Sequence, residues 1–150
     1  MYVELHARSA FSFLQGASLP EELAQIAADR GMGAVALLDR DGVYGAPRFH
    51  QAAKKLGVKA HIGAEVSVEG AGRWPLLARD RTGYRNLCRL VTRYKLRSKK
   101  GEGSATPGEM AEHAEGLVCL TGGDDGPLAE ALHRGGKDEA RREAERLVAT

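Results

Sequence analysis

The stretch from Leu37 to Glu65 most constrains the fold, because two short apolar runs flank a segment with a helical pattern. The first run ends directly before Asp39, and the second run ends at Glu65. This order is typical of a β-α-β unit, in which a right-handed crossover helix connects two parallel strands. Side chains at the carboxyl ends of parallel strands converge, so we expect Asp39 and Glu65 to point into one crevice.

The alternation of apolar runs and helical patterns continues along the chain and predicts an α/β protein with parallel strands. We expect strands at 2–6, 34–38, 58–68, 74–78 and 116–120, where the third is either one strand or two broken at Gly63. We expect helices at 19–30, 47–56, 82–96, 127–133 and 137–148. About five strands cannot close a barrel of seven or eight units, which needs roughly 200 residues or more. The chain is therefore either an open sheet or the first part of a larger fold.

Local signals refine these boundaries. Capping boxes are expected at Ser18–Glu21 and at Thr106–Glu109. Pro75 cannot donate a ladder hydrogen bond, so the strand at 74–78 is expected at an edge of the sheet, or starts late. The segment at about 98–106 is polar and rich in glycine and serine, which predicts a mobile loop.

The composition, with 43% hydrophobic and 28% charged residues, is that of an ordinary soluble domain. We expect a cytoplasmic protein without membrane contact, because the sequence has no membrane-length apolar stretch and no signal peptide. Cys88 and Cys119 show no CxxC spacing and are expected to be reduced thiols. A net charge of +2 and 5% aromatic residues do not indicate a dedicated nucleic-acid binder. Basic residues nevertheless crowd between Arg85 and Lys100, where they form either a solvated face or a local attraction for polyanions.

His6, Asp39 and Glu65 each lie at the end of a predicted strand. Histidine and carboxylate ligands suit zinc, manganese or iron, and a cluster of such ions could activate water against a phosphate ester. The alternative is that polar residues are common at strand ends and that these three coincide by chance. Both interpretations stay open on the pattern alone.

Four segments, in this order, resemble a known family: LHARSAFSFLQGAS, ALLDRDGVYGAPRFHQAAKKLGVKAHIGAEV, LLARDRTGYRNLCRLVTR and HAEGLVCLTGG. They are similar to the amino-terminal PHP (polymerase and histidinol phosphatase) domain of bacterial C-family DNA polymerases, most closely the error-prone branch of the alpha subunits. The resemblance covers Tyr2 to about Leu132. It implies that residues 1–150 form the first, truncated part of a (β/α)7-type barrel. In some members the strand ends hold up to three metal ions, with phosphoesterase or proofreading exonuclease activity.

The resemblance also identifies the positions of the metal ligands, most of which differ here. The His-x-His motif of the family reads His6, Ala7, Arg8, and its Thr-Asp-His motif reads Leu38, Asp39, Arg40. Gln15 stands where the family has an acid in the first loop, and Glu65 matches the glutamate of the Gly-x-Glu motif. Arg73 and Gly123 stand at the positions of two later ligands, and a one-residue shift of the alignment would put Trp74 in place of Arg73. The former metal-site positions are His6, Arg8, Gln15, Asp39, Arg40, Glu65, Arg73 and Gly123.

Arginine cannot deprotonate to become a metal ligand, so it places a permanent positive charge where a cation would sit. We therefore expect a PHP domain without metal, cofactor or catalytic residues, in which Asp39 and Glu65 form ion pairs with these arginines. Its expected role is structural, within a parent DNA polymerase that acts in replication and repair of damaged DNA. The expected partners are the rest of the polymerase chain, DNA through that polymerase, and accessory polymerase proteins.

Two alternatives to this hypothesis remain. The first is a zinc- or manganese-dependent phosphoesterase or 3'-5' exonuclease that uses His6, Asp39 and Glu65 with ligands beyond residue 150. The second is an anion site, in which Arg8, Arg40 and Arg73 capture a phosphate or sulfate, or the clustered arginines bind a DNA backbone.

Overall fold

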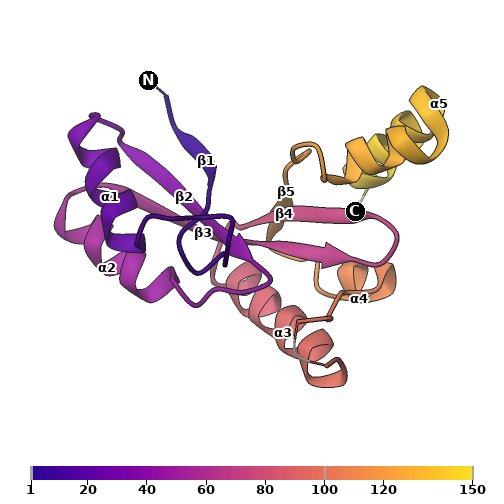
Figure 1. Ribbon diagram of the computed structural model, residues 1–150, viewed down its shortest axis with the longest axis horizontal. Helices are drawn as coiled ribbons and strands as arrows, with labels where there is room; N and C mark the ends of the chain where they lie inside the picture. The colour runs from indigo at the N-terminus through magenta and orange to yellow at the C-terminus, as the bar shows by residue number, and fades with distance from the viewer. Residues whose placement is uncertain (1, 100, 150) are drawn as a thin grey trace. The chain divides into compact units, whose positions relative to one another are not determined.

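The computed structural model describes residues 2–99 and 101–149, and the chain divides into two compact units, Met1–Ala64 and Glu65–Thr150 (Figure 1). Five strands form one sheet in the order β1-β2-β3-β4-β5, and β3 runs through the boundary between the units. This is a mixed α/β fold, as the sequence predicts.

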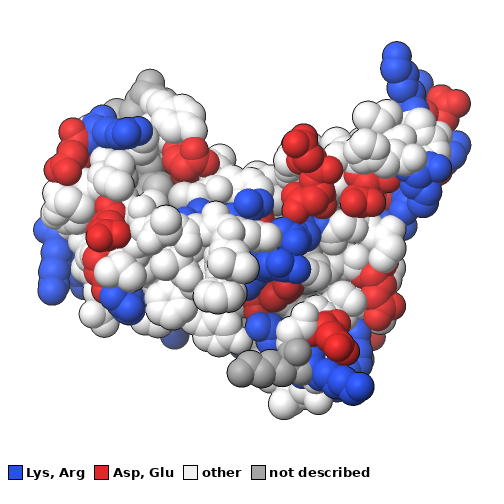
Figure 2. Space-filling model, in the orientation of Figure 1, with Lys and Arg blue, Asp and Glu red and all other residues white. Residues whose placement is uncertain are grey.

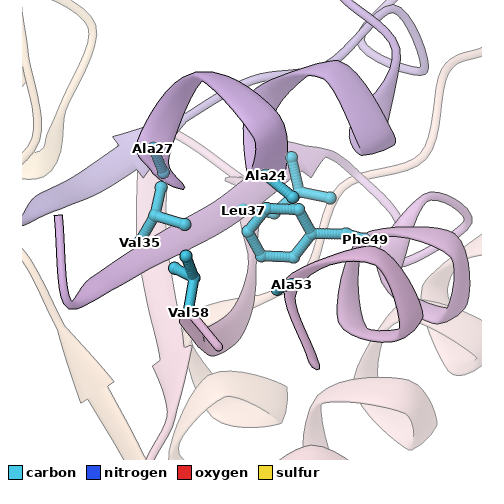
Figure 3. Packing of buried hydrophobic residues seen from close by; sticks show 7 residues of the cluster. All are labelled: Ala24, Ala27, Val35, Leu37, Phe49, Ala53 and Val58. Atoms are coloured by element: carbon cyan, nitrogen blue, oxygen red, sulfur yellow. The ribbon is translucent and has the colours of Figure 1, made fainter. Parts of the chain in front are cut away.

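The first unit confirms the β-α-β pattern that the apolar runs predict. It contains β1 (Glu4–Ala7), α1 (Pro20–Asp29), β2 (Ala34–Arg40), α2 (Ala46–Lys55) and the start of β3 (Lys59–Val68). β1 pairs with β2 in parallel, with Ala7 opposite Leu37. Between the two helices and β2 lies a closely packed core (Figure 3) made of Ala24, Ala27, Val35, Leu37, Phe49, Ala53 and Val58.

The second unit does not repeat the β-α-β crossover of the first unit. It contains the end of β3, then β4 (Gly72–Ala78), α3 (Arg81–Arg97), α4 (Pro107–Glu112), β5 (Leu117–Cys119) and α5 (Pro127–Ala149). α3 packs against β4 and β5, while α5 packs against β4. α5 comprises two helices, as predicted, because the backbone is not helical at Gly135 and Gly136, and Gly136 has a φ of 71°.

Parallel pairing is a wrong prediction for this unit. β4 and β5 are antiparallel, with Leu76 opposite Cys119. β3 and β4 are neighbours connected by residues 69–71 alone, and a connection this short cannot join parallel strands. A single run of apolar residues carries no information on strand direction, and the short connection sets it only for β3 and β4.

Two local predictions are also wrong. β4 starts at Gly72, before Pro75, so the strand does not start late. It lies between β3 and β5, so Pro75 is not in an edge strand. β5 is short and pairs only with the residues after Pro75, where ladder N–H groups are present. The cap of α1 is Leu19 and not Ser18, since the Leu19 N–H donates to the Glu22 carboxylate at 2.7 Å.

The capping box at the start of α4 is confirmed. The Thr106 hydroxyl accepts from the Glu109 N–H at 3.2 Å, and the Glu109 carboxylate accepts from the Thr106 N–H at 2.9 Å. Within the loop expected at 98–106, residue 100 lies outside the described residues. Ala105, near the end of this loop, is fully buried and hydrogen-bonds with Ser67 and Glu69. Mobility of the remainder stays a prediction.

Gly83 allows α3 to approach the turn before β5. A Cβ atom at this position would lie 1.8 Å from the carbonyl oxygen of Gly116, which is backbone and cannot rotate away. We expect Gly83→Ala to lower the free energy of unfolding by about 2–3 kcal/mol, the cost of overpacking a close contact. Urea unfolding followed by circular dichroism measures it. The matched control is Gly108→Ala in α4, where the nearest atom lies 3.9 Å away and no loss is expected. Equal stability of the two variants would contradict the prediction.

Candidate functional site

Asp39 is buried near the carboxyl end of β2, and one loop supplies all the hydrogen bonds recorded for its carboxylate. Its Oδ1 accepts from the backbone N–H of Ser9 at 2.7 Å and from the hydroxyl of Ser12 at 2.8 Å. Its Oδ2 accepts from the hydroxyl of Ser9 at 2.8 Å. All three residues are at most 1% exposed. We call Ser9, Ser12 and Asp39 the Asp39 anchor.

The loop between β1 and α1 brings its serines to Asp39 by folding tightly on itself. The Ser12 N–H donates to the Ser9 carbonyl at 2.9 Å, and the Ala10 N–H donates to the Ser18 carbonyl at 2.8 Å, which closes the loop. A Cβ atom at Gly16 would lie 2.2 Å from the Ser9 carbonyl oxygen, so only glycine fits there. Hydrogen bonds within the loop backbone therefore set the shape of the loop, and this shape brings Ser9 and Ser12 to Asp39.

The backbone at the start of α2 lies close to the carboxylate. A Cβ atom at Gly45 would lie 2.9 Å from Asp39 Oδ2. The Ser12 hydroxyl in turn accepts from the backbone N–H of Arg40 at 3.0 Å. Three donors occupy three of the roughly four lone-pair directions of a carboxylate. Asp39 thus has little capacity left for a cation.

The hydrogen-bond donors of the Asp39 carboxylate are serine groups, and Arg40 pairs with Asp41 instead of forming the predicted ion pair with Asp39. Arg40 is exposed and its Nε lies 3.6 Å from Asp41 Oδ2. Successive side chains of a strand point to opposite faces, which separates Arg40 from its neighbour Asp39. The motif therefore keeps the acid inside and turns the arginine to solvent.

The other residues of the first unit that the resemblance predicts as former metal-site positions lie on β1 and the loop after it. His6 lies within β1, and its backbone N–H donates to the Glu4 carboxylate at 2.8 Å. Arg8 follows β1 and is half-buried, whereas Gln15 is exposed in the loop.

In the second unit the resemblance predicts Glu65, Arg73 and Gly123 as former metal-site positions. Glu65 is 1% exposed and lies inside β3, which continues to Val68, so the predicted strand end at this glutamate is wrong. The Arg73 Nη1 lies 3.0 Å from Asp125 Oδ2. Gly123 is exposed after β5 and offers no side chain to a metal. Convergence of Arg8, Arg40 and Arg73 on one anion stays a prediction.

Across 2–99 and 101–149, no group of three or more His, Cys, Asp or Glu side chains could hold a metal ion. Burial raises the pKa of Cys119 to about 12, so this thiol stays protonated at neutral pH and is a weak nucleophile. No helix in the described part of the chain is long and apolar enough to cross a bilayer.

Residues 4–150 match the sequence profile of the family described as the PHP domain. The chain belongs to this family. This PHP domain is similar to part of the "Error-prone DNA polymerase" of Anaeromyxobacter sp. (strain K), which is 41% identical over 93% of the chain and 15% of its own length. The protein of the same name from Mycobacterium tuberculosis (strain ATCC 25618 / H37Rv) is 42% identical over 98% of the chain and 14% of its own length. The chain spans about 15% of these relatives.

A solved structure shows the same fold in a more distant protein. The amidohydrolase from Chromobacterium violaceum, solved with bound sulfate and no metal, aligns with a TM-score of 0.51 and 21% identity. The alignment covers 95% of this PHP domain and 54% of that chain. At this identity the likeness concerns the fold alone.

Sequence reasoning missed Ser9 and Ser12, the two residues that hold Asp39. A signal was available in RSAFS, where two serines three residues apart directly follow a strand, a spacing that favours a tight turn. Their partner lies 27 to 30 residues further along the chain, so the pattern could not identify it.

Proposed function

We propose that this PHP domain is the amino-terminal portion of an error-prone DNA polymerase and that its role is structural, without metal or catalysis of its own. The polymerase context is supported by relatives of that name, of which the chain spans about 15%. In this proposal the sheet is the first part of a (β/α)7-type barrel that later residues of the polymerase complete. Nucleotide addition then belongs to the remainder of the polymerase.

The observation that carries the structural role is the Asp39 anchor. A carboxylate kept for metal binding needs free lone pairs and neighbouring ligands that can lose a proton. Asp39 instead accepts three hydrogen bonds from the loop that follows β1. The acid of the family motif has become an internal attachment point for that loop. The neighbouring arginines, Arg8 and Arg40, cannot act as ligands at any accessible pH.

We expect the purified chain to contain less than about 0.1 zinc, manganese or iron per molecule, because a single satisfied carboxylate binds such ions weakly. Elemental analysis after expression in medium supplemented with zinc and manganese measures this content. Thermal unfolding with and without a chelator is the control, and the two midpoints should coincide. Two or three metal ions per chain, or manganese-dependent nuclease activity that Asp39→Asn abolishes, would contradict the proposal.

A further inference from the structure

Helix α3 carries an unusual share of the positive charge. Six of the 22 Lys and Arg residues lie on it, and none of the 20 Asp and Glu residues does. Its apolar side, including Leu87, Leu90 and Tyr94, is buried, so the basic side faces outward. On the face shown in Figure 2, basic and acidic side chains lie interspersed. The excess of positive charge on α3 therefore depends on which of its arginines pair with a carboxylate.

The carboxyl-terminal half of α3 is compensated by acidic residues of the same unit. Arg93 pairs with Glu112 and with Glu109, whose Oε1 lies 3.3 Å from the Arg93 Nε. Arg97 pairs with Glu109 and reaches Glu69 at 4.0 Å. The hydrogen bond from Arg97 lowers the pKa of the Glu109 carboxyl, so this acid stays ionised near neutral pH. The positive charges of these two arginines are therefore compensated by carboxylates of the same unit.

Arg85 and Arg89 are exposed one helical turn apart, and neither has a carboxylate partner in the part of the chain that the structure describes. Two like charges at this spacing destabilise a helix by about 0.2–0.5 kcal/mol. An uncompensated pair of this kind gains energy when an anion spans both guanidinium groups. The pair therefore differs from Arg93 and Arg97, whose charges are already compensated by carboxylates.

Both arginines line a shallow groove of about 610 Å³ between α3 and the end of α4. The groove also contains polar or charged groups from Tyr84, Thr92, Arg93 and His113. The His113 Nδ1 lies 2.8 Å from the Glu109 carbonyl oxygen, which can only accept, so Nδ1 carries the hydrogen. The groove thus combines two free guanidinium groups with hydroxyl donors and contains no acidic side chain in its described lining.

We propose that Arg85 and Arg89 bind the phosphodiester backbone of a nucleic-acid strand. Guanidinium groups form paired hydrogen bonds with phosphate oxygens, and two groups one turn apart can contact neighbouring phosphates. The Thr92 hydroxyl, on the same side of α3, adds a neutral donor of the kind common in backbone contacts. The choice of nucleic acid rests on the proposed polymerase function, while the site itself rests on the charges of α3.

The test is fluorescence anisotropy of a labelled DNA strand and of its duplex with the 150-residue chain, between about 50 and 200 mM salt. We expect Arg85→Gln/Arg89→Gln to weaken binding roughly tenfold at low salt and to reduce the slope of log K against log salt by about 2. The control Lys54→Gln/Lys55→Gln removes the same charge from α2 and should leave both quantities near the wild-type values. Circular dichroism should show equal helix content in all three proteins.

Several results would overturn the proposal: no salt-dependent binding by the wild-type chain, equal losses in both double variants, or displacement of DNA by poly-glutamate at equal charge concentration. The last result would identify an acidic protein segment as the ligand. None of these outcomes depends on metal content, so failure here is distinguishable from failure of the structural role.

Discussion

We expect the replacement of Asp39 by alanine to lower the free energy of unfolding by about 4 kcal/mol, because it leaves buried donors without acceptors. The Ser9 N–H and the two serine hydroxyls are all inaccessible to water and would lose the carboxylate together. A typical domain has a total stability of about 5–15 kcal/mol, so the loss is a large fraction of it. Urea unfolding monitored by far-ultraviolet circular dichroism gives the value.

The sign of this change distinguishes an anchor from a metal ligand. Functional carboxylates are commonly retained at a cost in stability, so removing a true ligand from the metal-free protein is expected to be neutral or stabilising. The conservative variant Asp39→Asn keeps one acceptor and should lose about half as much. Asp29→Ala, which removes an exposed carboxylate from the end of α1, should cost less than about 0.5 kcal/mol. A stabilising Asp39→Ala variant would refute the anchor.

We expect the replacement of Phe49 by alanine to lower the free energy of unfolding by about 4 kcal/mol, the usual cost of removing a fully buried ring. Phe49 is 0% exposed, and its side chain points from α2 into the core formed with α1 and β2 (Figure 3). Its neighbours there are mostly small, including Ala24 and Ala53, so they cannot fill the cavity by changing rotamer. The ring therefore supplies much of the volume of this core.

The controls for Phe49 separate ring volume from aromatic character. Phe49→Leu retains most of the apolar volume and should cost less than about 2 kcal/mol. Phe13→Ala removes a ring that is 81% exposed in the loop after β1 and should be close to neutral. Similar losses for Phe49→Ala and Phe13→Ala would show that the core of the first unit is not organised around Phe49.

Family membership and the architecture of the first unit could be predicted from the sequence. The apolar runs before Asp39 and at the start of β3, with a helix between them, have one physically reasonable arrangement, the β-α-β unit. The second unit was predicted less well. Its helices are near their expected positions, but β5 runs antiparallel to β4. The apolar pattern of GLVCL is the same for either direction, and only the surrounding packing selects one.

The sequence alone predicts a loss of ligand types, because by resemblance Arg8 and Arg40 align with histidines of the family motifs and arginine cannot give up its proton. Only the tertiary structure decided what Asp39 does instead. Its partners, Ser9 and Ser12, lie about 30 residues away and were not distinguishable from other loop serines. Hydrogen bonds of a buried carboxylate depend on which donors the folded backbone brings within about 3 Å, and that distance is not encoded in sequence spacing.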